Sequence, residues 1–188
     1  MAHCVHRNAT SNSQYETKVN VTGTAIHEID VMRWLLNDDI VAAKIVQPRV
    51  SKYVKNGQKD PQIIVFQTKT GIIIDVETFL HCQYGYDIQC EVVGEEGTIR
   101  LPDPAQVIVR QKAKCSFDIL EDWRYRFIDA YNIEFQSWVN NTKAGIVDGP
   151  TAWDGYAAIA VAEACLKSRE TGKWEAVHIE ETPEFYLI

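Results

Sequence analysis

The sequence predicts an α+β domain in which an open, mainly antiparallel sheet carries helices packed on one face. Two observations predict this class. Strand-like segments follow one another between residues 41 and 111 with only short turns between them, and segments of helical periodicity lie before and after them. Strands joined by tight turns pair antiparallel, and such a sheet usually buries one face beneath helices.

Three segments are expected to be helical, at residues 22–36, 121–143 and 151–171. In the first, core-facing positions recur at spacings of three and four, and Thr22 can cap its start. The third is rich in alanine and ends at Gly172, a residue type suited to a helix C-cap. The second is amphipathic, and the side chains expected to face the core are Phe127, Ala130, Ile133 and Trp138.

Alternation of polar and apolar residues predicts the strands. They are expected at residues 1–10, 41–50, 62–69, 71–84, 86–93, 98–101, 106–111 and 174–179, with turns at 69–71 and 94–97. The sheet face expected beneath the helices carries Ile74, Val76, Leu80, Ile88, Cys90 and Val92. The opposite face, with Phe79 among acids and amides, is a candidate for pairing with a second copy of the chain.

Composition limits the classes of partner. The 188 residues are 46% apolar and 24% charged, which is typical of one soluble globular domain. A formal net charge of -7 without basic runs argues against nucleic acid and membrane surfaces. The five cysteines form no C-x-x-C pair, so we expect no metal site or disulfide framework, and reduced thiols in the cytoplasm.

Motifs for nucleotide binding are missing from these 188 residues. No G-x-G-x-x-G and no G-x-x-x-x-G-K-S/T occurs, and the close pair Gly94 and Gly97 belongs to a predicted hairpin. A dinucleotide needs a glycine-rich turn between a strand and a helix. We therefore expect this chain alone to bind no cofactor.

A few polar residues are candidates for a site. His6 and Asn8 lie on one side of the first strand because their spacing is two, and His27 and Asp30 share one helix face at i, i+3. Tyr84 and Tyr86 flank Gly85. From spacing alone each pair has a simpler interpretation: a hydrogen-bonded or surface histidine, a surface ion pair, and aromatic packing.

Several longer segments resemble one family. Residues 26–36 (Ile-His-Glu-Ile-Asp-Val-Met-Arg-Trp-Leu-Leu) and 82–92 (Cys-Gln-Tyr-Gly-Tyr-Asp-Ile-Gln-Cys-Glu-Val) are similar to stretches of bacterial inositol dehydrogenases. So are residues 3–8, 122–131 and 149–156. The resemblance runs in register to about residue 180 and places the chain in the glucose-fructose oxidoreductase/inositol dehydrogenase (Gfo/Idh/MocA) family.

The resemblance implies a two-domain enzyme that oxidises a ring hydroxyl of inositol or a related polyol with NAD. Residues 1–188 would form the second domain, of the dihydrodipicolinate-reductase-like type, which binds substrate and builds a homodimer or homotetramer through its sheet. The NAD-binding Rossmann domain is expected to be absent from this chain, and the isolated chain is expected to be inactive.

Carried over residue by residue, the resemblance assigns His27 as the catalytic base. The residues it assigns to substrate binding are His6, Asn8, Asp30, Tyr84 and Tyr86, with Trp123 and Tyr131 near the site or merely packed beside it.

One position departs from the family pattern. The family has an aspartate four residues before the histidine, and this chain has Gly23 there. The alternative is therefore a catalytically inactive module that binds polyol or forms oligomers.

Overall fold

The computed structural model describes residues 1–188 except 13, 56, 105 and 187–188. Within the described residues, one sheet has seven strands in the order β6-β5-β1-β4-β3-β2-β9. All neighbouring pairs are antiparallel apart from β1 and β4, which run parallel. The strands are β1 (Ala2–Arg7), β2 (Ile40–Val46), β3 (Gln62–Thr68), β4 (Ile73–Phe79), β5 (Asp87–Val93), β6 (Thr98–Arg100) and β9 (Glu175–Ala176).

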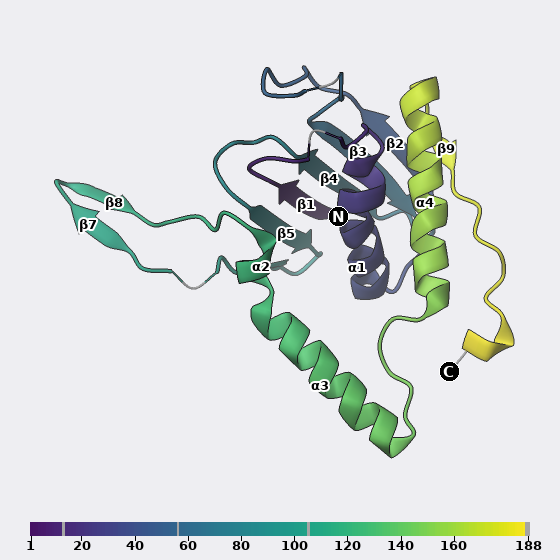
Figure 1. Cartoon of the computed structure of the whole chain (residues 1–188). Helices are drawn as coiled ribbons and strands as arrows, with labels where there is room; N and C mark the ends of the chain where they lie inside the picture. The colour runs from purple at the N-terminus through teal and green to yellow at the C-terminus, as the bar shows by residue number, and fades with distance from the viewer. Residues whose placement is uncertain (13, 56, 105, 187–188) are drawn as a thin grey trace.

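Two long helices cover one face of this sheet (Figure 1). They are α1 (Ile26–Leu36), which continues directly from a π-helical turn η1 (Asn20–Ala25), and α4 (Ala152–Thr171). The α4 helix begins at a capping box between Thr151 and Asp154 and ends at Gly172, whose φ of 70° suits a residue without a side chain. The predicted α+β class with helices on one face is confirmed.

The core lies between the helices and alternate residues of the strands. Ile64, Phe66, Ile74 and Val76 are fully buried on the covered face, against a group that includes Ile29. Burying each such side chain stabilises the fold by about 1.5–3 kcal/mol. Leu80 is also buried, and Cys90 and Val92 pack against this core, so the predicted covered face is largely confirmed.

The two-stranded ribbon at residues 109–116 and the helix at residues 128–144 project from the body of the domain (Figure 1). The prediction that residues 106–111 form a strand of the main sheet is wrong. The strand there is β7 (Val109–Gln111), which pairs with β8 (Lys114–Ser116) in a separate two-stranded ribbon. The helix predicted at 121–143 is broken at Phe127 into α2 (Trp123–Arg126) and α3 (Ile128–Ala144).

The prediction that α3 faces the core is also wrong. Ile133 is 68% exposed and Trp138 is 65% exposed, Ala130 is exposed, and only Phe127 is partly buried. An apolar stripe on a helix indicates that it packs against something, but not against what.

Several predicted boundaries shift. The first helical segment starts at Asn20, so Thr22 lies inside it and is not its cap. The strands predicted at 41–50 and 71–84 end at Val46 and Phe79, because a loop and a turn follow them. The final strand covers Glu175–Ala176 instead of 174–179. The predicted turns at 69–71 and 94–97 are confirmed by hydrogen bonds Gly71 N–H to Thr68 O and Gly94 N–H to Gly97 O.

No helix among the described residues is both long enough and apolar enough to cross a membrane.

Candidate functional site

Three aromatic side chains meet where β1 and α1 approach the start of β5. The His6 and His27 rings are stacked, with centroids 6.1 Å apart and 24° between their planes. The Tyr86 ring meets His6 edge-on at 5.8 Å. His6 comes from β1, His27 from the first turn of α1, and Tyr86 directly precedes β5. The structure thus brings together three residues that the sequence analysis singled out separately.

A buried carboxylate fixes the orientation of His6. His6 Nδ1 lies 2.8 Å from Glu28 Oε1, and both side chains are buried. The other carboxylate oxygen, Oε2, has no hydrogen-bond partner among the described residues. This bond leaves Nε2 of His6 free for a ligand. Glu28 was missed in the sequence because its partner lies 22 residues away, although it directly follows His27.

His27 itself is exposed, and no side-chain hydrogen bond joins it to another described residue. Gly23 lies one turn earlier, in the π-helical segment. A carboxylate at that position would lie on the same side of the helix as the imidazole. The acid–imidazole pair of this site is therefore Glu28 with His6, while His27 has none.

Tyr86 is held by its backbone as well as by its ring. Its N–H donates to Leu120 O at 2.6 Å, and Phe127 meets its ring edge-on at 6.3 Å. The preceding Gly85 has φ of 148°, and a Cβ there would lie 2.7 Å from Ile119 and 2.8 Å from the Leu120 oxygen. Glycine is required at this position.

The Tyr86 hydroxyl is a hydrogen-bond donor at neutral pH. Burial raises the pKa of Tyr86, and the negative charge of Glu28 raises it further. Tyr131, on α3, acts on the pKa of Tyr86 in the same direction. Trp123 on α2 and Tyr131 on α3 lie edge-to-face at 6.2 Å, and each is 44% exposed. The residue between these two helices, Phe127, is the one that contacts Tyr86.

Asn8 and Asp30 lie on the segments that carry the two histidines. The backbone of Asn8 is fixed by bonds to Phe79 O at 2.9 Å and from Cys82 N–H at 3.0 Å. Asp30 follows His27 by three residues on α1 and is half-buried. Both residues therefore remain candidates for polar contacts with a ligand.

Tyr84 does not join the cluster of His6, His27 and Tyr86; its side chain contacts Arg7 and Asp87 instead. Its hydroxyl accepts a hydrogen bond from Arg7 Nη1 at 2.9 Å and donates one to Asp87 Oδ2 at 2.5 Å. Arg7 also forms an ion pair with Glu77 through two hydrogen bonds, at 2.6 and 2.7 Å. Arg7 follows His6 in β1, so it points to the opposite, open face of the sheet. Burial and Asp87 raise the pKa of Tyr84 to about 12.

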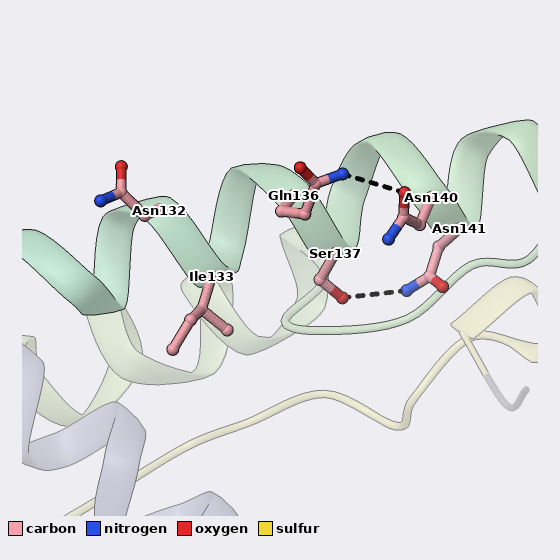
Figure 2. Close-up of a pocket in the computed structure, with 6 residues that line it drawn as sticks. All are labelled: Asn132, Ile133, Gln136, Ser137, Asn140 and Asn141. Atoms are coloured by element: carbon pink, nitrogen blue, oxygen red, sulfur yellow. Dashed lines mark hydrogen bonds between the residues drawn. The ribbon is translucent and has the colours of Figure 1, made fainter.

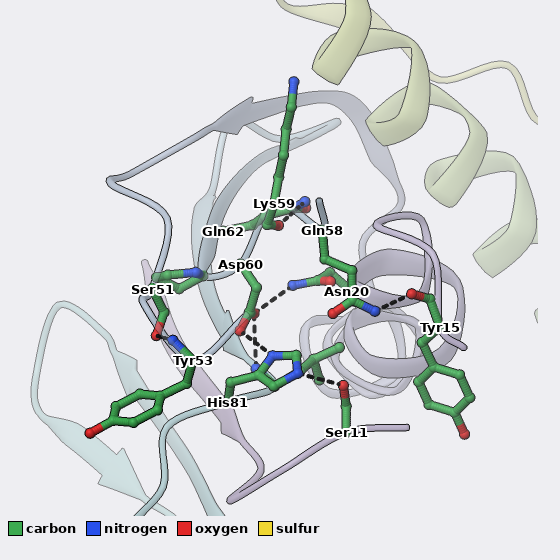
Figure 3. A network of polar contacts seen from close by, with 12 residues as sticks. Ser11, Tyr15, Asn20, Ser51, Tyr53, Gln58, Lys59, Asp60, Gln62 and His81 are labelled. Atoms are coloured by element: carbon green, nitrogen blue, oxygen red, sulfur yellow. Dashed lines mark hydrogen bonds and ion pairs between the residues drawn. The ribbon is translucent and has the colours of Figure 1, made fainter. Parts of the chain in front are cut away.

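A second buried carboxylate, that of Asp60, joins segments that are distant in sequence (Figure 3). Asp60 is fully buried and accepts three hydrogen bonds. The donors are Asn20 Nδ2 at 2.8 Å, Leu80 N–H at 2.9 Å and His81 Nδ1 at 3.0 Å. His81 Nε2 lies 3.0 Å from Ser11 Oγ. One carboxylate thus links the chain after β1, the start of the helix and the end of β4.

Ser11, His81 and Asp60 are hydrogen-bonded in sequence, hydroxyl to imidazole to carboxylate, as in a nucleophilic triad. Here, however, the imidazole is only 5% exposed, and the carboxylate also fixes an amide and a backbone N–H. These contacts describe a structural clamp, and the segments it joins are those that carry Asn8, His27 and Tyr86.

A shallow groove on α3 is a weaker candidate (Figure 2). It is lined by Asn132, Ile133, Gln136, Ser137, Asn140 and Asn141. Its side chains bond one another, Gln136 to Asn140 at 3.0 Å and Asn141 to Ser137 at 3.2 Å. It has no titratable side chain and so offers no acid–base chemistry. No group of metal-ligating side chains is found in the part of the chain that the structure describes.

The family comparison agrees with the resemblance noted in the sequence. Residues 15–177 match the oxidoreductase family C-terminal alpha/beta domain. The chain belongs to this family.

The similar relatives are inositol dehydrogenases. The chain is 52% identical over 186 residues to inositol 2-dehydrogenase of Serratia proteamaculans, covering 99% of this chain and 55% of that protein. It is 50% identical to the enzyme of Klebsiella pneumoniae over the same shares. The chain therefore spans about half the length of the curated relatives it matches.

Solved structures give the same picture. Myo-inositol dehydrogenase from Lactobacillus casei, in complex with NAD(H) and myo-inositol, superposes with a TM-score of 0.93 at 37% identity, over 98% of this chain and 56% of that one. The scyllo-inositol dehydrogenase of the same organism shares the fold. It superposes with a TM-score of 0.82 at 21% identity, over 94% of this chain and 56% of that one.

We predict that Asp60→Ala lowers the free energy of unfolding by about 3 kcal/mol, because three buried donors lose their acceptor. Urea denaturation measures this change. The control is Asp39→Ala, which removes an exposed carboxylate that bonds Arg33 at 2.8 Å. Its loss is expected to cost less than about 1 kcal/mol. Equal, small losses in both variants would contradict the clamp.

Proposed function

We propose that this chain is the polyol-binding half of an NAD-dependent inositol 2-dehydrogenase. The observation that carries the proposal is the convergence of His6, His27 and Tyr86 in one cluster. The similarity to a protein solved with NAD(H) and myo-inositol supports the choice of ligand. A cyclic polyol presents several hydroxyls, and this cluster offers several fixed donors and acceptors to receive them.

His27 is proposed as the base. Oxidation of a ring carbinol releases a proton from the hydroxyl and a hydride from the same carbon, and the hydride passes to the nicotinamide of NAD. The exposed imidazole of His27 can take the proton, because histidine is the side chain that most often acts as a general base in enzymes.

The other residues position the substrate. His6, whose Nδ1 is held by Glu28, and Tyr86, whose ring meets His6 edge-on, are proposed to bind neighbouring hydroxyls through Nε2 and the phenol oxygen. Asn8 and Asp30, with Trp123 and Tyr131 at the rim, extend this set. Rejection of a wrong epimer follows when it leaves one of these buried polar groups without a partner.

NAD does not fit the described part of this chain. After β1 the chain enters a loop, described over residues 8–12 and 14–18, and not a tight glycine turn. None of the glycines lies between a strand and the helix that follows it. We therefore propose that a separate N-terminal Rossmann domain holds the cofactor, and that the present chain is a single domain that is inactive by itself. We propose a cytoplasmic location for the whole enzyme.

The direct test is a chimera in which this chain replaces the matching 186 residues of the Serratia proteamaculans relative. We predict NAD reduction with myo-inositol, and a fall in kcat of about 10²–10⁴-fold in His27→Gln because proton transfer is lost. The control His178→Gln changes an exposed histidine outside the cluster and should leave kcat unchanged. A well-folded chimera that binds NAD but oxidises no inositol would refute the proposal.

The second candidate is an inactive polyol-binding or oligomerisation module. The observation that favours it is Gly23, which leaves His27 without a carboxylate partner. In a serine-protease triad, loss of the orienting carboxylate lowers the rate by about 10⁴-fold. Inositol binding without turnover in the chimera would select this candidate.

We predict that Gly23→Asp raises kcat of the chimera by at least about tenfold, because a carboxylate one turn before His27 orients the imidazole and stabilises its charged form. The new side chain must displace only the tip of Val19, whose Cγ1 lies 3.0 Å from the added Cβ. Steady-state kinetics measure the gain. The control Thr22→Asp adds the same charge at the neighbouring exposed position. An equal response in both variants would show that orientation plays no part.

We further propose that the open sheet face forms a homodimer or homotetramer. This face exposes Ile63 opposite Val46, beside the charged group of Arg7 and Glu77. Exposed apolar side chains on a sheet face favour self-association. A monomeric mass of the chimera by sedimentation would count against this assembly.

A further inference from the structure

Two cysteines face each other across the β1–β5 ladder. Cys4 and Cys90 are direct partners in the antiparallel register. The pair Met1 and Val93, at the end of the same ladder, exchanges both backbone hydrogen bonds at 3.0 and 2.8 Å. Bonded and non-bonded pairs alternate along an antiparallel ladder, so Cys4 and Cys90 form a non-hydrogen-bonded pair.

This register brings the two thiols close together. Cα atoms of a non-hydrogen-bonded pair lie about 4.5 Å apart, with both side chains on the same face. Disulfides span Cα separations of roughly 4.4–6.8 Å, so a bond fits here near the short end of the range. Bonds at the edge of the allowed geometry are strained, and strained disulfides are more easily reduced.

The two thiols differ in access and reactivity. Cys4 is only 2% exposed, and Cys90 is half-buried at the margin of the core. Hydrogen bonding from the Cys4 thiol lowers the pKa of Cys90 to about 7, and the same bond, together with burial, raises that of Cys4. A thiolate is the form that attacks a disulfide. Cys90 is therefore the attacking residue and Cys4 the resolving one.

We propose that Cys4 and Cys90 form a reversible cross-strand disulfide by exchange with a small-molecule disulfide such as oxidised glutathione. The Cys90 thiolate attacks one sulfur of glutathione disulfide, giving a mixed disulfide and one glutathione thiolate. The Cys4 sulfur, losing its proton to solvent, then attacks Cys90 Sγ and releases the second glutathione. Two protein thiols are oxidised, and one glutathione disulfide is reduced to two glutathione thiols.

The pair lies next to the proposed substrate site but does not depend on it. Cys4 precedes His6 by two residues on β1, and both point to the covered face of the sheet. Formation of the disulfide requires only the β1–β5 register, so it can be tested independently of the proposed dehydrogenase function.

The experiment uses the chain with Cys82→Ser and Cys115→Ser, which remove the two other thiols that are not buried. A serine at 82 can still donate to Gly85 O, the partner of the Cys82 thiol at 3.3 Å. After incubation with oxidised glutathione, we expect the three remaining thiols to fall to one. Peptide mapping should find Cys4 joined to Cys90, and dithiothreitol should restore all three thiols.

Two single changes in that background separate the roles. Cys4→Ser should trap glutathione on Cys90, and Cys90→Ser should leave the buried Cys4 unmodified. Circular dichroism checks that each variant is folded. In the folded parent, a Cys90–glutathione adduct that never resolves, or no reaction at Cys90, would overturn the proposal.

Discussion

The position of β1 inside the sheet is the constraint on which the site depends. This strand hydrogen-bonds to β4 on one side and to β5 on the other, so its register is fixed twice. Side chains alternate between faces, so His6 points beneath the helices and Arg7 to the open face. A slip of one residue would exchange them and remove His6 from both Glu28 and Tyr86.

Two buried carboxylates then fix what surrounds β1. Glu28 reaches from α1 to His6, and Asp60 gathers the loop after β1, the helix start and the end of β4. Buried carboxylates are costly unless donors surround them. Asp60 therefore ties its three donors into one arrangement, and Glu28 holds His6 through a single bond. The cluster of His6, His27 and Tyr86 is thereby assembled by segments that are distant in sequence.

The sequence was sufficient for the fold class and for the face of the sheet that the helices cover, because period-2 alternation reports burial directly. It failed for α3, whose apolar stripe carries no information about which partner covers it. It also missed Glu28, because a single side-chain bond between β1 and α1 has no local signature. Tyr84 and Tyr86 were grouped by spacing, but Gly85, with φ of 148°, breaks the strand parity between them.

The most direct measurement of the central claim follows the histidine rings by NMR. The chimera would carry labelled histidine only in this chain, joined by segmental ligation, and would be loaded with NADH so that no turnover occurs. On titration with myo-inositol, we predict changes in the ring chemical shifts of His6 and His27. His3 on the open face, His81 in the clamp and His178 should remain unchanged. Saturating binding without any shift at His6 or His27 would contradict the assigned site.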